Sequence, residues 1–82
     1  EWGPSGVRVN AVSPGVTRTE FARPLTDRPE VMERRLALTP LRRIAEPEEI
    51  AAAVLYLASP GGAFTTGHNL IVDGGTTIGD GN

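Results

Sequence analysis

Two short apolar runs, each bounded by glycine and proline, have the pattern of β-strands. Residues 7–12 alternate β-branched and polar side chains after Gly6 and before a Ser-Pro-Gly turn, and Arg8 and Asn10 share one face. Residues 69–73 have a continuous apolar centre framed by glycines, as in parallel strands that are buried on both faces. The sequence therefore predicts strands over 7–12 and 69–73.

A strong helix is predicted over residues 46–58. Pro47 occupies the first helical position, glutamates follow in the first turn, and a Pro-Gly-Gly sequence ends the helix. Almost every remaining position is apolar, so we expect burial on two sides. One apolar stripe is formed by Ile50, Val54, Leu57 and Ala58; one side of the helix is expected to pack on a sheet and the other on a partner.

A shorter helix is predicted over residues 28–38. Pro29 lies in its first turn, and Asp27 and Glu30 have the spacing of a capping box. The preceding segment is broken by proline and is too short for a long helix. We interpret the whole of residues 19–44 as a flap of the kind that covers a binding site.

The order of strand, helix and strand predicts a parallel pair in an α/β fold. Residues 1–6 are typical of the end of a helix and a turn, and residues 77–82 of a flexible tail. At 82 residues, the chain is at most one small domain, and its burial would only balance the cost of ordering. We therefore expect residues 1–82 to be a single partial domain, best explained as a truncation.

Composition excludes several classes of function. The net charge is −2 and the basic residues, all arginine, are scattered among acids, which argues against nucleic-acid binding. The absence of cysteine and the single histidine exclude disulfides and multi-histidine metal sites. The longest apolar run is far too short for a membrane span, and no signal segment opens the chain, so a cytoplasmic location without membrane contact is expected.

Several motifs resemble the short-chain dehydrogenase/reductase family. Residues 6–15, Gly-Val-Arg-Val-Asn-Ala-Val-Ser-Pro-Gly, with Thr19 after them, resemble its late Pro-Gly segment. The resemblance continues through residues 40–50, the helix end at 57–59, Thr66-Gly67 and Val72-Asp73-Gly74-Gly75. It covers roughly residues 1–76 in the family's order and spacing, which is far more specific than any single motif.

This resemblance implies the C-terminal third of an oxidoreductase that uses NAD or NADP on an alcohol or carbonyl substrate. The fold would be a doubly wound parallel sheet, of which this chain supplies the last two strands, the helix between them and the flap. A homo-oligomer through helix 46–58 and strand 69–73 is expected. The alternative is a truncated, catalytically inactive module that binds a related full-length subunit.

The resemblance also assigns cofactor-binding residues. Pro14, Gly15, Val16 and Thr19 match the segment that holds the nicotinamide end of the cofactor, with the main chain at Val16 on the carboxamide and the Thr19 hydroxyl nearby. Proline fixes φ and glycine lacks Cβ, so the chain can turn at the carboxyl end of a strand, where α/β sheets bind ligands. Thr19 could instead cap the segment that follows it.

No catalytic residue is predicted. The family's acid/base pair is Tyr-x-x-x-Lys, yet this chain has no lysine, and its one tyrosine, Tyr56, lies mid-helix and is interpreted as a packing residue. The glycine spacing of residues 75–81 imitates a phosphate loop, but no helix follows it. Arg42 and Arg43 are interpreted as part of a solvated, paired face.

A hydrolase triad is also disfavoured. His68 could be combined with Asp73 and with Ser13 or Ser59, but the chain has no Gly-x-Ser-x-Gly elbow. Asp73 and the two glycines after it are interpreted as a tight turn that ends the strand.

Overall fold

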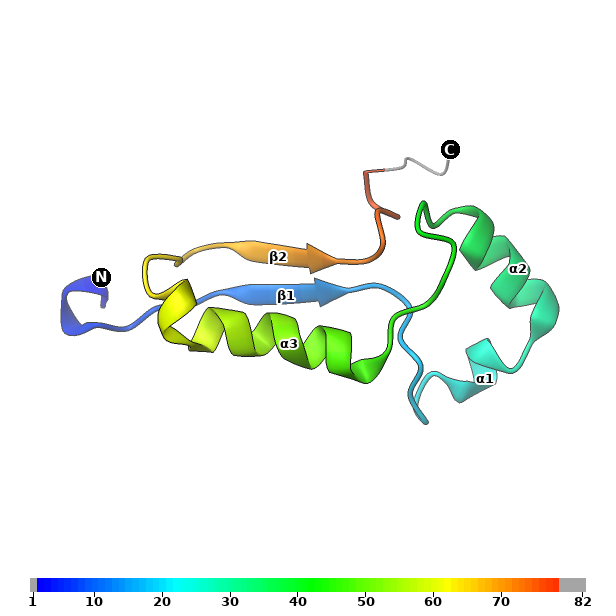
Figure 1. Ribbon diagram of the computed structural model, residues 1–82, viewed down its shortest axis with the longest axis horizontal. Coiled ribbons are helices and arrows are strands. Elements are labelled where there is room, and N and C mark those ends of the chain that lie inside the picture. The colour runs from blue at the N-terminus through cyan, green and yellow to red at the C-terminus, as the bar shows by residue number, and fades with distance from the viewer. Residues whose placement is uncertain (1, 79–82) are drawn as a thin grey trace.

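The computed structural model describes residues 2–78, and a pair of parallel strands forms its centre (Figure 1). β1 spans Ala11–Pro14 and β2 spans Asn69–Val72. Their register pairs Ala11 with Asn69 and Pro14 with Val72. The predicted parallel pair and the α/β class are confirmed.

The first strand begins at Ala11 and ends at Pro14, so both of its ends lie later in the chain than those of the predicted strand over 7–12. Ahead of it, the chain is held mainly by side chains that reach the loop before β2. Arg8 Nη1 donates to the carbonyls of Gly62 (2.7 Å) and Thr65 (3.1 Å), and Asn10 Nδ2 donates to Thr65 (3.0 Å). Arg8 and Asn10 therefore share a face as predicted, and they supplement a main-chain bond ahead of β1, from the Gly67 N–H to the Val9 carbonyl at 2.8 Å.

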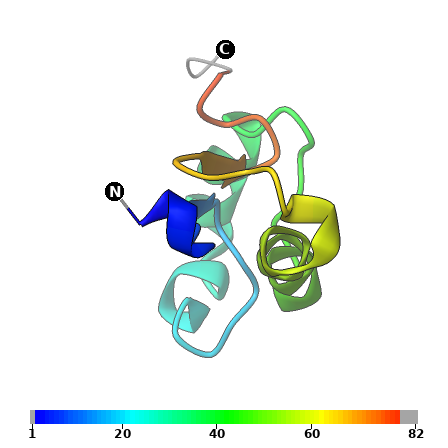
Figure 2. The same cartoon turned by 90° about the vertical axis from the view of Figure 1, so that its left-hand side faces the viewer.

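The helix α3 (Pro47–Ala58) covers one face of the strand pair (Figure 2). It begins at the predicted proline, and the Glu46 N–H donates to Glu49 Oε1 at 2.9 Å, which satisfies one of the exposed donors at the helix start. A turn of 3₁₀-helix, η2 (Pro60–Gly62), follows it. The helix predicted over 46–58 is therefore confirmed.

The face of α3 that packs on the strands includes only part of the predicted apolar stripe. The less exposed apolar positions are Ile50, Ala53 and Leu57, whereas Val54 is 51% exposed and Ala58 is also exposed. Ala53 and Val54 both lie one helical turn from Ile50 and from Leu57, and in the structure Ala53 is the less exposed of the two. The apolar character of the helix alone could not choose between these registers.

Residues 19–44 contain two helices at the carboxyl end of the strands, α1 (Arg23–Thr26) and α2 (Pro29–Ala37). The helix predicted over 28–38 is present, but its N-cap is Arg28. The predicted capping box of Asp27 and Glu30 is therefore wrong, because the helix begins one residue too late for it. The Asp27 carboxylate instead lies 3.3 Å from Arg23 Nε.

The two ends of the chain are only partly described. Residues Gly3–Ser5 form a 3₁₀ turn, η1, which ends at Gly6 with φ of 82°, a left-handed conformation that favours glycine. Of the tail predicted over 77–82, residues 79–82 lie outside the described residues, as does the end of the phosphate-loop-like spacing over 75–81. The described part of that tail begins with Thr77, which is bonded to Asp73.

Very little of the described chain is buried. Among residues 2–78, only Leu57 and Gly62 are buried, and Leu57 retains 8% of its exposure. The accessible surface is 6124 Å², against about 4,700 Å² for a compact monomer of this mass. No helix in residues 2–78 combines the length and apolar character needed to cross a membrane.

Candidate functional site

The Pro14-Gly15 turn lies where the carboxyl ends of both strands meet. The Gly15 N–H donates to the Val72 carbonyl at 2.9 Å, and the Thr17 hydroxyl donates to the Gly15 carbonyl at 3.0 Å. A Cβ on Gly15 would lie 2.9 Å from Asp73 Cα, which is closer than real contacts allow. Glycine at this position is therefore required by the close approach of the two chain segments.

Val16 follows the turn and is half-buried. Its carbonyl accepts a hydrogen bond from the Ala45 N–H at 2.9 Å, and the Arg18 N–H donates to the Ala45 carbonyl at 2.9 Å. Thr17 and Ala45 thus form an isolated parallel bridge beside the sheet. Within residues 2–78, the Val16 N–H has no hydrogen-bond partner, so the main chain offers a donor at the carboxyl end of β1.

Thr19 lies just beyond the bridge, at the start of the flap. Its Oγ1 accepts a hydrogen bond from the Ala22 N–H at 3.1 Å, which is the capping role considered as the alternative. A hydroxyl can accept and donate at once, so the Thr19 O–H proton remains available to a second partner. The cap therefore leaves room for a ligand contact at the same side chain.

Two ion pairs connect the base of the flap with the start of α3. Arg18 Nε lies 3.0 Å from Glu46 Oε1, and Arg43 binds Glu49 with both guanidinium Nη atoms at 2.7 Å. The hydrogen bonds from Arg43 and from the Glu46 N–H lower the pKa of Glu49 to about 2. The paired face predicted around Arg43 is present.

Arg42, the other arginine of the predicted paired face, instead turns back to α2. Its Nη1 donates to the Leu36 carbonyl at 3.1 Å and also to the Ala37 carbonyl. Its own φ is 57°, an unusual value for a residue with a side chain. Arg42 thus caps the carboxyl end of α2, where carbonyls lack partners and a cation is favourable.

Asp73 closes the strand pair by forming a tight turn, as predicted. Its Oδ1 accepts from the Gly75 N–H at 2.9 Å, and its Oδ2 accepts from the Thr77 N–H at 2.9 Å and from the Thr77 hydroxyl. These bonds, led by the one from the Thr77 hydroxyl, lower the pKa of Asp73. The Asp73 carboxylate therefore stabilises the turn by accepting hydrogen bonds from Gly75 and Thr77.

A small cavity of about 90 Å³ lies between these elements. It is lined by the Pro-Gly turn, the end of β2, the end of α2 and the segment before α3. Gly15 and Val16 line it, whereas Pro14 and Thr19 do not. Ile44 and Ala45 also line the cavity, but they were not predicted as site residues. The pairing of Ala45 with Thr17 leaves no local signal in the sequence.

The arrangements that the sequence disfavoured are not assembled in the described residues. His68 and Asp73 lie beyond opposite ends of β2, and the Ser13 hydroxyl donates to Asn69 while that of Ser59 donates to the Tyr56 carbonyl. No group of three metal-ligating side chains occurs within residues 2–78. Tyr56, interpreted as a packing residue, is 48% exposed in this structure.

Taken together, the parallel strand pair, the helix α3 that covers one face of it and the turn at the carboxyl ends of the strands define an α/β protein. The family described as "Enoyl-(Acyl carrier protein) reductase" matches residues 1–77. The chain therefore belongs to the short-chain dehydrogenase/reductase family.

Among curated relatives, galactitol 2-dehydrogenase (L-tagatose-forming) of Cereibacter sphaeroides is 51% identical over 78 residues, which are 95% of this chain and 31% of that protein. D-threitol dehydrogenase of Mycolicibacterium smegmatis is 46% identical, over 95% of this chain and 30% of that protein. The chain thus spans about 30% of the length of these relatives.

Solved structures show the same relationship. 4-Hydroxyisoleucine dehydrogenase complexed with NADH matches with a TM-score of 0.89 at 34% identity, over 94% of this chain and 32% of that chain. A putative 2-deoxy-D-gluconate 3-dehydrogenase from Agrobacterium tumefaciens with bound NADP matches with a TM-score of 0.90 at 31% identity, over 94% of this chain and 31% of that chain.

Proposed function

We propose that this chain is the C-terminal portion of an NAD- or NADP-dependent short-chain oxidoreductase that acts on an alcohol or carbonyl substrate. The observation that carries this proposal is the Val16 main chain, which offers an N–H without a partner in the described residues at the carboxyl end of β1. This is the edge at which doubly wound sheets bind nucleotides. Two of the solved relatives carry NADH and NADP.

The residues around this donor suit the nicotinamide end of such a cofactor. Gly15 has no side chain to cover the turn, the half-buried Val16 N–H could donate to a carboxamide oxygen, and the Thr19 O–H remains able to donate. Pro14, Gly15, Val16 and Thr19 are therefore proposed to hold the cofactor, whose nicotinamide supplies or accepts the hydride.

The groups that move the substrate's proton are proposed to lie outside this chain. Residues 19–44 would form a flap over the substrate, because their helices extend from the same edge of the sheet as the Pro-Gly turn. The outward side chains of α3, Val54, Leu55 and Tyr56, together with β2, would pack against a second subunit. A cytoplasmic location remains part of this proposal.

The alternative proposal is a module without catalytic activity that docks on a related full-length subunit. The exposed apolar side of α3 favours it as much as it favours an oligomer of complete enzymes. Cofactor binding separates the two. Reading the coding sequence upstream of Glu1 is the first test. An in-frame Tyr-x-x-x-Lys motif there supports the enzyme, and a start codon directly before the Glu1 codon supports the module.

The decisive protein is a chimaera: galactitol 2-dehydrogenase of Cereibacter sphaeroides in which this chain replaces the 78 matching residues. We expect the chimaera to bind NADH or NADPH and to oxidise galactitol, because the described site would then face the missing part of the sheet. A chimaera that does not fold, or that folds without binding either cofactor, contradicts the proposed function.

In the chimaera, Gly15→Ala is expected to lower stability by about 1–3 kcal/mol, because the new Cβ must displace the Asp73 backbone. The melting temperature should fall by about 2–12 °C in a protein of this size class. Gly61→Ala is the matched control, since its Cβ would meet the nearest atom at 3.6 Å. Equal melting temperatures for the two variants would show that the turn tolerates a side chain.

Thr19→Val in the chimaera removes the hydroxyl and keeps the branched shape. We expect the cofactor dissociation constant to rise about 2- to 13-fold, the value of one hydrogen bond. The Ala22 cap is lost as well, at a cost of ~1 kcal/mol in stability. The measurement is the Kd for NADH by fluorescence together with the melting temperature.

Two further variants separate the cofactor contact of Thr19 from its cap. Thr19→Ser keeps the hydroxyl and should bind cofactor like the parent, and Thr26→Val removes a flap hydroxyl that donates only to the Arg23 carbonyl. An unchanged Kd in Thr19→Val with a lowered melting temperature would make Thr19 a structural cap and nothing more.

A further inference from the structure

The flap is closed at its base by main-chain pairing. Residues 19–44 leave the sheet after Thr17 and return at Ala45, where the two residues form a parallel bridge. Its two hydrogen bonds, from Ala45 N–H to the Val16 carbonyl and from Arg18 N–H to the Ala45 carbonyl, are both 2.9 Å long. The flap base is therefore in direct contact with the residue proposed to hold the cofactor.

The main chain around Val16 is held by hydrogen bonds on two sides. On one side, the Gly15 N–H is bonded to the end of β2 through the Val72 carbonyl at 2.9 Å. On the other side, the Val16 carbonyl is bonded to Ala45. The Val16 N–H belongs to the Gly15–Val16 peptide, whose carbonyl accepts a hydrogen bond from the Thr17 hydroxyl at 3.0 Å. Because Ala45 pairs with Thr17 and bonds the Val16 carbonyl, a shift of Ala45 would move Val16 and Thr17 together and redirect the Val16 N–H with them.

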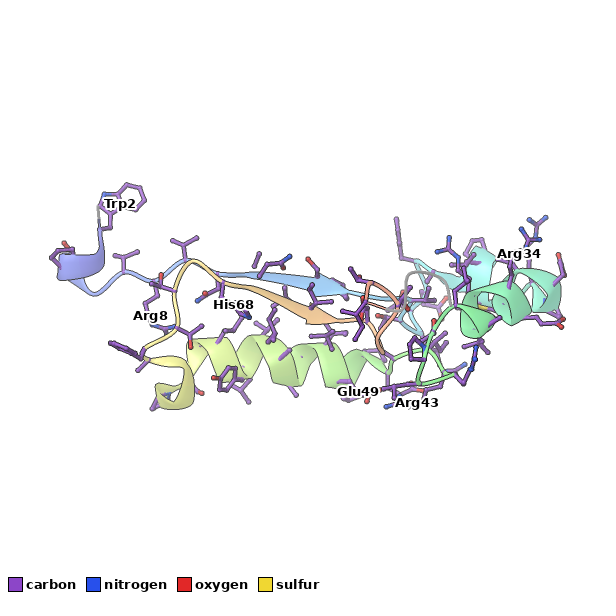
Figure 3. All side chains as sticks on the ribbon, turned by 90° about the horizontal axis from the view of Figure 1, so that it is seen from above. Trp2, Arg8, Arg34, Arg43, Glu49 and His68 are labelled. Carbon is purple, nitrogen blue, oxygen red and sulfur yellow. The ribbon has the colours of Figure 1, made fainter. Side chains whose placement is uncertain are left out.

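Ala45 is in turn held by an ion pair on α3. Arg43 Nη1 donates to the Ile44 carbonyl at 3.3 Å, and both Nη atoms bind the Glu49 carboxylate at 2.7 Å (Figure 3). Glu49 lies in the first turn of α3, the helix that packs on the strand pair. The bidentate geometry fixes direction as well as distance.

We propose that Arg43 and Glu49 are positioning residues for cofactor binding, which hold Ala45 against Val16 so that the Val16 main chain keeps one orientation. This inference rests on the proposed function, because it concerns the same site. The side chains of Arg43 and Glu49 are 55% and 40% exposed, so their ion pair contributes little to the stability of the fold. Its effect is expected in the orientation of the bound cofactor.

The test uses the chimaera with Glu49→Gln. Glutamine keeps an oxygen that can accept from the Glu46 N–H, so the start of α3 is preserved while the charge pair with Arg43 is lost. We expect the Kd for NADH to rise about 2- to 10-fold, the range of one misaligned hydrogen bond, with the KM for galactitol changed less than twofold. Arg43→Gln should give the same change.

The double variant Arg43→Gln/Glu49→Gln should bind NADH no worse than either single variant, because the two residues act as one unit. Arg23→Gln is the matched control, since Arg23 also forms exposed ion pairs, with Glu20 and Asp27, and these pairs do not include the Ile44 or Ala45 main chain. Its Kd should equal that of the parent.

A second readout needs no cofactor. In the apo chimaera, the amides of Arg18 and Ala45 should exchange hydrogen faster in Glu49→Gln than in Arg23→Gln, because these amides donate the two bridge bonds. Unchanged Kd and exchange in Glu49→Gln would overturn the inference and leave the proposed function intact. The inference would also be overturned if Glu49→Gln weakened NADH binding, raised the KM for galactitol and lowered the melting temperature together. That result would show that the pair of Arg43 and Glu49 is purely structural.

Discussion

The purified 82-residue chain is expected to catalyse no transfer of hydride between NADH or NADPH and any carbonyl compound. Proton transfer to a carbonyl oxygen needs a group with a tuned pKa beside the cofactor. The chain contains no lysine that could lower the pKa of a tyrosine, and Tyr56 lies in the second half of α3, whereas the Pro14-Gly15 turn lies beside the start of that helix.

The measurement is the absorbance of the reduced nicotinamide with a panel of ketones and aldehydes. The chimaera, which adds the remainder of galactitol 2-dehydrogenase, serves as the positive control. Host reductases are the main contaminant, so Tyr56→Phe is assayed in parallel. Turnover that exceeds the buffer background and disappears in Tyr56→Phe would contradict the prediction, because it would make Tyr56 the acid.

The isolated chain is also expected to lack a cooperative monomeric fold. Its radius of gyration is 15.3 Å, against about 12 Å for a compact chain of this length, and large apolar side chains such as Trp2 and Phe64 are exposed. The other edge of β1 and the second face of the strand pair are uncovered in the described residues. Burial of this extent does not exceed the entropy cost of ordering.

Circular dichroism melting at several concentrations, together with sedimentation, measures this. We expect a broad transition, binding of a hydrophobic dye, or a melting temperature that rises with concentration as chains associate. The same residues within the chimaera should melt cooperatively. A sharp two-state transition of a monomer, independent of concentration, would show that this chain is a self-sufficient fold.

The sequence analysis found the elements because their signals are local. A proline at the first helical position and glycines after the last fix both ends of α3, and the glycine-framed run predicts β2. The prediction failed where a choice depends on neighbours. The start of β1 depends on the contacts of residues 8–10 with the loop before β2, and Asp27 is not a cap because α2 begins one residue later than predicted.

The candidate site divides in the same way. The segment proposed to hold the cofactor lies within six consecutive residues, Pro14, Gly15, Val16 and Thr19 among them. It can therefore be recognised from the order of residues alone, and so can the backbone chemistry of its proline and glycine. The sequence by itself thus determined the family, the parallel strand pair and the segment proposed to hold the cofactor.

Only the tertiary structure decided what surrounds that segment. Gly15 must be glycine because Asp73 approaches it, Val16 is held by Ala45, and Arg43 is directed by Glu49. Gly15 and Val16 are separated in the sequence from Asp73 and Ala45, so no periodicity or local propensity records these contacts. They arise because the parallel strands and the flap return to the same edge of the sheet. This return brings residues that are distant in the sequence within hydrogen-bonding distance of each other.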